Sequence, residues 1–285
     1  IPEGSVIFPK EPLLKVVAPI MEAQLVETAI LNIINHQSLI ATKASRVVFA
    51  AAGDGIMEFG LRRAQGPDAG LYGARAAVIG GCVGTSNVLA GKLFDVPVLG
   101  THAHSWIMSF PDEYTAFKAY ADLYPDNCTL LVDTYDTLKS GVPNAIRVFQ
   151  EMRDAGVKLT RYGIRLDSGD LAYLSKKARK MLDEAGFEDA TIAASNDLDE
   201  YLLHDLKIQG AAITSWGVGT NLITSKDCPS FGGVYKLAAI KTEDGEFVPK
   251  IKLSENTEKI TNPGNKTIYR IYDKATGKIR ADLIC

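Results

Sequence analysis

Residues 100–110 read Gly-Thr-His-Ala-His-Ser-Trp-Ile-Met-Ser-Phe, and they contain two of the four histidines in the chain. A short apolar run, Val96–Leu99, precedes them, and an amphipathic pattern follows. This order predicts a turn between a buried strand and a helix, with His102 and His104 on the turn. Because open α/β sheets and barrels bind ligands at this end of their strands, we expect a functional site here.

The same order of strand, turn and helix recurs along the chain. The predicted strands are short apolar runs at Ile56–Phe59, Ala76–Ile79, Val96–Leu99, Thr129–Val132, Tyr162–Arg165, Thr191–Ala194 and Ala211–Thr214. Helical periodicity fills the intervals, for example at Asn144–Ala155, Leu171–Ala185 and Leu198–Leu206. Strands that alternate with helices form a parallel sheet with right-handed crossovers. About seven such units favour a parallel, TIM-like, irregular α/β barrel over an open sheet. The absence of a Gly-x-Gly-x-x-Gly motif after the first strand disfavours a dinucleotide-binding fold.

The two ends of the chain differ in texture from this alternating part. Residues 1–45 are predicted to be the remnant of an N-terminal domain plus a long helix at Ile20–Ala44, and residues 46–230 to form the barrel with the active site. Residues 231–285 are predicted to form antiparallel strands that pack with the N-terminal segment as a partial second domain. Within this tail the expected strands are Val234–Ile240, Phe247–Leu253 and Thr267–Tyr272. We expect the sequence to be a fragment of a longer protein.

Composition narrows the class of protein. Of the 285 residues, 46% are hydrophobic and 23% are charged, as in an ordinary globular protein. The net charge of −3 gives no reason to expect a nucleic-acid or membrane partner. The four cysteines are scattered without metal-ligand spacing, which fits a reducing compartment. With no signal peptide and no apolar run of membrane length, the predicted location is the cytoplasm.

Carboxylates follow two of the predicted strands. Asp133 and Asp136 come after one strand, and Asp167 and Asp170 come after another. Oxygen ligands of this kind suit Mg²⁺, which usually takes one or two carboxylates together with substrate phosphates. The alternative is that Asp136 and Asp170 cap the helices that follow, and we leave it open for these two residues. For Asp133 and Asp167, which lie nearer their strands, a functional role is favoured.

Glycine-rich turns and two arginines indicate an anionic ligand. Residues 217–220, Gly-Val-Gly-Thr, and residues 80–85, Gly-Gly-Cys-Val-Gly-Thr, are expected to present backbone N–H groups to phosphate at the start of a helix. Arg62 and Arg165 would neutralise anionic groups, with a structural ion pair as the alternative for each. Phe59 could stack on a flat ring, although an isolated phenylalanine more often lies in the core.

The two histidines are too close together for a helical metal pair, and no third ligand has a suitable spacing, so zinc is disfavoured. A neutral imidazole can also act as a nucleophile that accepts a phosphoryl group. A structural role is the alternative for an isolated histidine. In this turn, among predicted phosphate and Mg²⁺ ligands, we favour a functional role for one of the two.

Several of these motifs together resemble the nicotinate phosphoribosyltransferase family. They are Glu58-Phe59-Gly60-Leu61-Arg62-Arg63-Ala64-Gln65-Gly66, Gly84-Thr85-Ser86-Asn87, Gly100-Thr101-His102-Ala103-His104-Ser105, Arg165-Leu166-Asp167-Ser168-Gly169-Asp170 and Gly217-Val218-Gly219-Thr220. The match runs from about Glu3 to the C-terminus, with the motifs in the same order. The resemblance implies a homodimeric enzyme of NAD salvage that joins nicotinate to phosphoribosyl diphosphate, giving nicotinate mononucleotide and diphosphate. It also implies coupling to ATP hydrolysis through a phosphorylated histidine, with Mg²⁺ as cofactor.

The resemblance further implies roles for particular residues. His104 would carry the phosphoryl group, whereas His102 matches a variable position and has no assigned role. His104, Asp167 and Arg165 would be the catalytic residues, and Asp133 and Asp167 would serve Mg²⁺-diphosphate and the ribose. The implied substrate-binding residues are Phe59, Arg62, Ser86, Thr101, Asp133, Asn196, Gly217, Gly219 and Thr220. Ser86 stands where related nicotinamide enzymes have an Asp, which favours nicotinate. The alternatives are a nicotinamide or quinolinate phosphoribosyltransferase, or a non-catalytic barrel that binds a phosphorylated metabolite.

Overall fold

The computed structural model describes residues 1–255 and 260–285, and it divides into two compact units. One unit comprises Ile1–Asn35 together with Gly232–Cys285, and the other comprises His36–Phe231. The sequence analysis placed the domain boundaries after residues 45 and 230. Residues 256–259, which belong to the predicted antiparallel tail, lie outside the described residues. Within the described ranges, no helix has the length and apolar character needed to cross a membrane.

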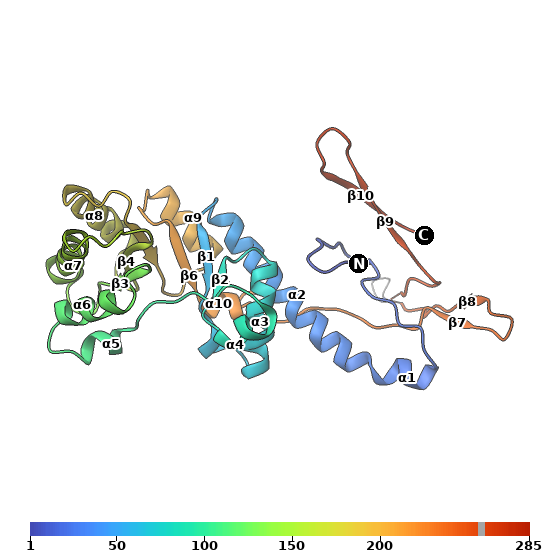
Figure 1. The fold of residues 1–285 in the computed structure, drawn as a ribbon. Helices are drawn as coiled ribbons and strands as arrows, with labels where there is room; N and C mark the ends of the chain where they lie inside the picture. Colours follow the sequence, from blue (N-terminus) through green and yellow to red (C-terminus); the bar gives the residue numbers. More distant parts are fainter. Residues whose placement is uncertain (256–259) are drawn as a thin grey trace. The chain divides into compact units, whose positions relative to one another are not determined.

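The larger unit is built on a sheet of six parallel strands that curls into a half-barrel (Figure 1). Its order is β2-β1-β6-β5-β4-β3, so β2 and β3 are the edges. The strands are β1 (Gly55–Glu58), β2 (Gly84–Thr85), β3 (Cys128–Leu131), β4 (Tyr162–Leu166), β5 (Thr191–Ala194) and β6 (Ser215–Val218). The predicted parallel α/β fold is confirmed. All six carboxyl ends lie along one edge of the sheet, because every pairing is parallel.

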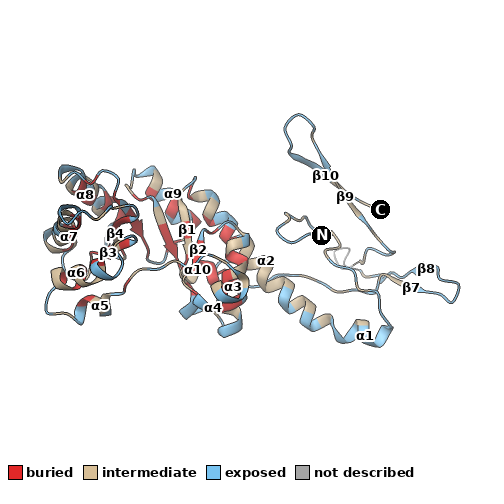
Figure 2. Ribbon diagram, viewed as in Figure 1, coloured by how far each residue is buried: buried red, intermediate tan, exposed pale blue. Residues whose placement is uncertain are grey.

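Helices precede the first strand, connect consecutive strands and follow the last strand of the sheet. They are α2 (Glu27–Ala50), η1 (Leu61–Arg63), α3 (Pro67–Ile79), α4 (Val88–Phe94), α5 (His104–Met108), α6 (Glu113–Leu123), η2 (Thr137–Gly141), α7 (Val142–Asp154), α8 (Leu171–Glu184), α9 (Glu200–Ile208) and α10 (Thr220–Ile223). Several begin at a side-chain cap: Asn87 accepts from the N–H of Ala90, and Asp199 accepts from the N–H of Leu202. Buried residues concentrate on the strands and on the helix faces turned toward them (Figure 2).

Among the strands predicted in the alternating part of the chain, two were wrong and a third was only partly right. Ala76–Ile79 forms the last turn of α3, which starts at Pro67, because a short apolar run satisfies a buried helix as well as a strand. The strand predicted at Ala211–Thr214 lies four residues further on as β6, where residues 215–218 pair with β1. At Val96–Leu99 the structure has a single parallel bridge, from Val98 to Thr85.

The smaller unit contains the short helix α1 (Ile20–Leu25) and two antiparallel hairpins. One hairpin pairs β7 (Ala239–Lys241) with β8 (Phe247–Pro249), and the other pairs β9 (Ile268–Tyr272) with β10 (Ile279–Ile284). The guanidinium of Arg270 on β9 binds both carboxylate oxygens of Asp282 on β10, at 2.8 and 2.7 Å, and donates to the Val6 carbonyl at 2.6 Å.

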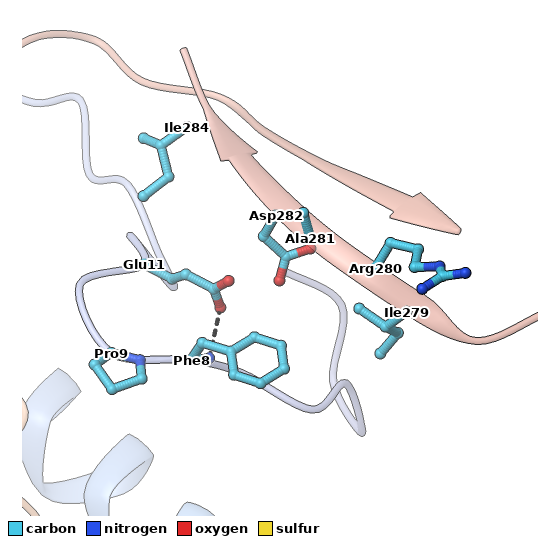
Figure 3. Close-up of a pocket in the computed structure, with 8 residues that line it drawn as sticks. All are labelled: Phe8, Pro9, Glu11, Ile279, Arg280, Ala281, Asp282 and Ile284. Carbon is cyan, nitrogen blue, oxygen red and sulfur yellow. Dashed lines mark hydrogen bonds between the residues drawn. The ribbon is translucent and has the colours of Figure 1, made fainter. Parts of the chain in front are cut away.

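A cavity of about 330 Å³ lies in this unit between the N-terminal segment and β10 (Figure 3). Its lining includes Phe8, Glu11 and Asp282. The Phe8 N–H donates to Glu11 Oε2 at 2.9 Å, which fixes the turn that forms one wall. None of the residues predicted to form the functional site lines this cavity.

Candidate functional site at the carboxyl ends of the strands

The predicted site residues follow the carboxyl ends of the six strands and of the bridged segment at Val98. Phe59 and Arg62 come after β1, Ser86 after β2, Thr101 and His104 after the bridged segment, Asp133 after β3, Asp167 after β4, Asn196 after β5, and Gly219 and Thr220 after β6. Two more lie within the last residues of their strands, Arg165 in β4 and Gly217 in β6. The parallel topology therefore gathers them at one edge of the half-barrel.

Arg165 is the centre of the most closely connected group. Its guanidinium donates to Ser195 Oγ at 2.9 Å, to Thr101 Oγ1 at 2.7 Å and to Asp167 Oδ1 at 2.8 Å. Ser195 Oγ in turn donates to the same carboxylate oxygen. These contacts occupy three of the five N–H donors of an arginine, which leaves two for a ligand. Arg165 therefore forms the structural ion pair that was the predicted alternative, with Asp167. Two of its N–H groups have no partner among these contacts, so the ion pair does not exclude a ligand.

Asp167 is held ionised by this group. Burial opposes ionisation of its carboxyl, but the hydrogen bond from Ser195 and the positive charge of Arg165 outweigh burial and lower its pKa. The second oxygen, Oδ2, lies 3.6 Å from His104 Nε2. A carboxylate with one oxygen bound to a guanidinium and the other turned toward the site can still bind a ligand.

Asp133 joins the end of β3 to the end of β4. Its Oδ2 accepts from the backbone N–H of Asp167 at 2.8 Å and from Ser168 Oγ at 2.6 Å. The side chain is only 2% exposed, and its Oδ1 is buried without a hydrogen-bond partner in the described structure. That oxygen lies 3.9 Å from His104 Nε2. A buried carboxylate oxygen without a donor is suited to a cation.

The two histidines of the motif have different surroundings. His104 is the first residue of α5, and its side chain is 37% exposed, with Nδ1 3.0 Å from Thr134 Oγ1 and Nε2 facing Asp133 and Asp167. His102 is 8% exposed and lies among aromatic rings. Only His104 therefore presents a ring nitrogen toward the open part of the site.

Phe59 directly follows β1 and is hydrogen-bonded to the last residue of β6. Its N–H donates to the Val218 carbonyl at 2.8 Å, and its ring lies 5.8 Å from the guanidinium carbon of Arg165. A Cβ on Gly217 would come within 2.5 Å of this ring, so the glycine makes room for it. Phe59 and Arg165 thus form one surface, with an aromatic face next to a cation.

The remaining predicted residues lie on the same edge without joining the Arg165 group. Arg62 is exposed in η1 and has no ion pair among the described residues. Asn196 is exposed, with a φ of 106° that is rare outside glycine. Thr220 opens α10, and the Ser86 N–H donates to the Glu58 carbonyl at 3.0 Å. In the described part of the chain, no hydrogen bond connects these four side chains with Arg165.

Three other expectations can be compared with the structure. Asp136 and Asp170 cap η2 and α8 by accepting from the N–H groups of Lys139 and Tyr173, at 2.9 Å each, so the capping alternative fits both residues. Residues 80–85 were predicted to lie at the start of a helix, and this was right only for their end, because Gly84-Thr85 forms β2 shortly before α4. Gly80 instead ends α3, and Gly81, with a φ of 106°, starts the next turn. Glycine is common at both ends of helices, and the sequence does not distinguish them.

The structure adds residues that the sequence analysis did not select. Glu58, the last residue of β1, is fully buried and accepts from the Gly60 N–H and from Thr85 Oγ1, the latter at 2.6 Å. Burial raises the pKa of its carboxyl, and the two hydrogen bonds offset part of this effect. The sequence feature that could have identified Glu58 is its position as a charged residue at the end of an apolar strand. Ser195 and Thr134 also contact predicted site residues, but neither has a distinctive local pattern.

The fold is a parallel α/β half-barrel, and the site defines a class of protein in which aspartates, an arginine and a histidine converge at the carboxyl ends of the strands. The model of the nicotinate phosphoribosyltransferase (NAPRTase) family matches residues 55–269. A nicotinate phosphoribosyltransferase of Bacillus subtilis is 57% identical over 282 residues, 99% of this chain and 56% of that protein. One from Dictyostelium discoideum is 44% identical over 316 residues, 95% of this chain and 52% of that protein.

A solved structure of human nicotinic acid phosphoribosyltransferase has the same fold, with a TM-score of 0.80 and 32% sequence identity. The match covers 99% of this chain and 62% of the human one. The chain belongs to the nicotinate phosphoribosyltransferase family. It spans about half the length of the curated relatives that it matches.

Proposed function

We propose that this chain supplies the catalytic barrel of a nicotinate phosphoribosyltransferase. The reaction transfers the phosphoribosyl group of phosphoribosyl diphosphate to the ring nitrogen of nicotinate and releases diphosphate, coupled to ATP hydrolysis. The observation that carries the proposal is the surface formed by Phe59 and Arg165, where an aromatic face lies next to a guanidinium with two unused donors. Nicotinate combines a flat ring with a carboxylate, so it matches both parts of this surface.

In this proposal the nicotinate ring stacks on Phe59, and its carboxylate binds Arg165. The Thr101 hydroxyl would join this contact by turning its proton from the His102 carbonyl to the carboxylate. The ring nitrogen attacks C1 of the ribose as the bond to diphosphate breaks, and positive charge builds up on the sugar. The Asp167 carboxylate, held ionised by Ser195 and Arg165, would stabilise that charge. Gly217, Gly219 and Thr220 would hold the ribose phosphate. Support comes from the meeting of these residues at one edge of the sheet.

Mg²⁺ fits the carboxylates that are present. Asp133 Oδ1 is buried and accepts no hydrogen bond from the described residues, and Asp133 Oδ1 and Asp167 Oδ2 both face His104 Nε2, at 3.9 and 3.6 Å. Among the described residues, no three acidic, histidine or cysteine side chains form a cluster that could hold a metal alone. Two carboxylates completed by substrate oxygens are the usual surroundings of Mg²⁺. When bound there, Mg²⁺ would neutralise charge on the departing diphosphate.

His104 is the proposed phosphoryl acceptor. Its Nε2 would form a bond to the γ-phosphorus of ATP as the bond to the bridging oxygen breaks and ADP leaves, and water would later release phosphate. Its exposure supports this role over that of His102, which is buried. Ser86 in place of an acidic residue favours a carboxylate-bearing substrate. As the resemblance implies, we also propose that the protein acts as a homodimer in the cytoplasm.

The test is product formation with carboxyl-labelled nicotinate, phosphoribosyl diphosphate, Mg²⁺ and ATP. Nicotinate mononucleotide should form with the parent sequence and not with Arg165→Ala. The Arg161→Ala variant is a control for general loss of positive charge, because Arg161 is exposed at the amino end of β4, away from the carboxyl ends of the strands. Equal turnover of nicotinamide or quinolinate, or saturable nicotinate binding that is unchanged in Arg165→Ala, would contradict the proposal.

A further inference from the structure

His102 occupies a position between the two edges of the half-barrel. On one side, the segment that precedes it pairs with edge strand β2, where the Leu99 N–H donates to the Thr85 carbonyl at 2.9 Å. On the other side, the backbone N–H of Leu131 on edge strand β3 donates to His102 Nε2 at 3.3 Å. In Figure 1 the chain between α4 and α5 runs from the β2 side of the sheet to the β3 side. Residues 99–102 therefore connect the two edges through one strand-like pairing and one side chain.

The surroundings of His102 suit this contact. The residue is 8% exposed, and its ring makes an edge contact with Tyr120 at 4.6 Å between centroids and a tilted contact with Phe117 at 6.1 Å. Burial lowers the pKa of His102 to about 4, so the ring is neutral at physiological pH. Acceptance of the Leu131 amide proton by Nε2 requires the tautomer protonated at Nδ1, which is buried and has no hydrogen-bond partner among the described residues. Without this acceptor, the Leu131 N–H would be buried and unsatisfied, since among the described strands β3 pairs only with β4, on its other side.

We propose that His102 is a positioning residue, whose hydrogen bond from Leu131 fixes the distance between the phosphoryl acceptor His104 and the carboxylates of Asp133 and Asp167. This role rests on the proposed function of His104. His102 is two residues from His104 on one side of the contact, and Leu131 is two residues from Asp133 on the other. The contact thus couples the two turns that face each other across 3.9 Å, from His104 Nε2 to Asp133 Oδ1.

A second contact follows from the same placement. Thr101 Oγ1 donates to the His102 carbonyl at 3.2 Å and accepts from Arg165 at 2.7 Å. A shift of His102 away from β3 would therefore also move the hydroxyl that binds Arg165. An apolar side chain of similar size would keep the core packed, but it would fix neither the His104–Asp133 distance nor the Thr101–Arg165 distance. The acceptor atom is what distinguishes the proposed role from simple packing.

The test compares His102→Leu, which removes the acceptor but fills the space, with His102→Gln, whose amide oxygen can replace Nε2. Phe117→Leu is the matched control, because it weakens the packing around the ring and leaves the acceptor in place. The readout is the rate at which γ-labelled ATP and Mg²⁺ place acid-labile phosphate on the folded protein. Misplacement of reacting groups by about 1 Å can cost about 100-fold. We therefore expect a loss of about 10- to 100-fold in His102→Leu, most of it restored in His102→Gln.

A measurement on the parent protein tests the contact directly. With uniform ¹⁵N labelling, a scalar coupling should be seen between the Leu131 amide nitrogen and Nε2 of His102. Its absence, a parent-like labelling rate in His102→Leu, or a His102→Gln variant as slow as His102→Leu would overturn the proposal. A parent protein that shows the coupling but takes up no phosphate would instead overturn the proposed function of His104, and the positioning role with it.

Discussion

The packing of Phe59 against Gly217 gives a sharp test of how the site is built. A Cβ at residue 217 would lie 2.5 Å from Cδ2 and 2.7 Å from Cε2 of Phe59. Carbon atoms in ordinary contact are about 3.5–4.0 Å apart, so Gly217→Ala should push the ring back by about 1 Å. Overpacking of this kind costs about 1–3 kcal/mol, and replacing a strand glycine regains about 0.5–1 kcal/mol. The expected net loss of unfolding free energy is about 1–2 kcal/mol.

Urea unfolding followed by tryptophan fluorescence measures this loss. Both tryptophans of the chain, Trp106 and Trp216, lie in the larger unit, and Trp216 is fully buried next to the substituted residue. In a double-mutant cycle with Phe59→Ala, the overpacking cost of Gly217→Ala should vanish, because the clashing ring is gone, and only the gain of about 0.5–1 kcal/mol should remain. The coupling free energy should therefore equal the overpacking cost, about 1–3 kcal/mol in size.

The same substitution should act on catalysis, because it moves the ring proposed to stack on nicotinate. A displacement of about 1 Å predicts a fall in kcat/KM for nicotinate of up to about 100-fold, while the rate of ATP-dependent labelling of His104 stays near that of the parent. Two results would refute the reasoning. One is a destabilisation by Gly217→Ala that persists in the Phe59→Ala background. The other is a parent-like kcat/KM in a protein that shows the destabilisation.

Other predictions concern buried polar groups. Glu58→Gln leaves one of its two donors, the Gly60 N–H or the Thr85 hydroxyl, without an acceptor and should cost about 1–3 kcal/mol, whereas Thr85→Ser should be nearly neutral; urea unfolding measures both. His102 has a folded pKa of about 4, below its unfolded value of 6.5, so the unfolded chain binds a proton first as pH falls. Stability should drop by up to about 3 kcal/mol between pH 6.5 and 4, and His102→Gln should flatten that slope in pH-dependent unfolding. Lys43, 4% exposed, bridges Glu200 and Asp227 at 2.7 Å each, so Lys43→Met should cost about 3 kcal/mol in thermal unfolding; a stabilised variant would contradict this.

The strand predictions were accurate where the local sequence alone determines the strand. The predicted Thr191–Ala194 coincides with β5, and Tyr162–Arg165 falls one residue short of β4, because each is a short apolar run between turn signals. The strand at 215–218 was misplaced for a reason that lies elsewhere in the chain. Its register is set by pairing with β1, from Gly55 opposite Ser215 to Glu58 opposite Val218, and no local pattern records that pairing. Pairing with β1 thus places the strand at residues 215–218, which include Ser215 and Gly217, and not at the more apolar residues 211–214.

The site shows the same division between local and long-range information. That Asp133 and Asp167 follow strands could be predicted from hydrophobic periodicity and residue type. The contact of Arg165 with Thr101, which is 64 positions away in sequence, could not be predicted, because it depends on the curl of the sheet. Ser195 had no signal of its own, since a serine after a strand is common in any turn. The sequence alone predicts which residue types follow the strands and in what order. The distances between these residues and the identity of their partners can be obtained only from the folded structure.

These partners form a pattern that no single residue reveals: polar contacts join the end of each strand to the next around the carboxyl edge. The contacts are Glu58 with Thr85 between β1 and β2, His102 with Leu131 next to β3, Asp133 with Asp167 between β3 and β4, Arg165 with Ser195 between β4 and β5, Asn221 with Asp197 between the turns after β5 and β6, and Phe59 with Val218 between β6 and β1.

Such a series explains why the site needs buried polar groups that packing alone would disfavour. Each strand pairs with its neighbours in the sheet, and backbone bonds such as that from Phe59 to Val218 extend this pairing by one residue beyond some strand ends. Further into the turns, side-chain contacts take over from the backbone pairing. A buried carboxylate such as Glu58 is costly by itself and is compensated by fixing two turns at once. Catalysis by charge stabilisation depends on groups that do not have to reorganise. The polar contacts at the strand ends therefore extend the order of the sheet into the turns where the chemistry is proposed to occur.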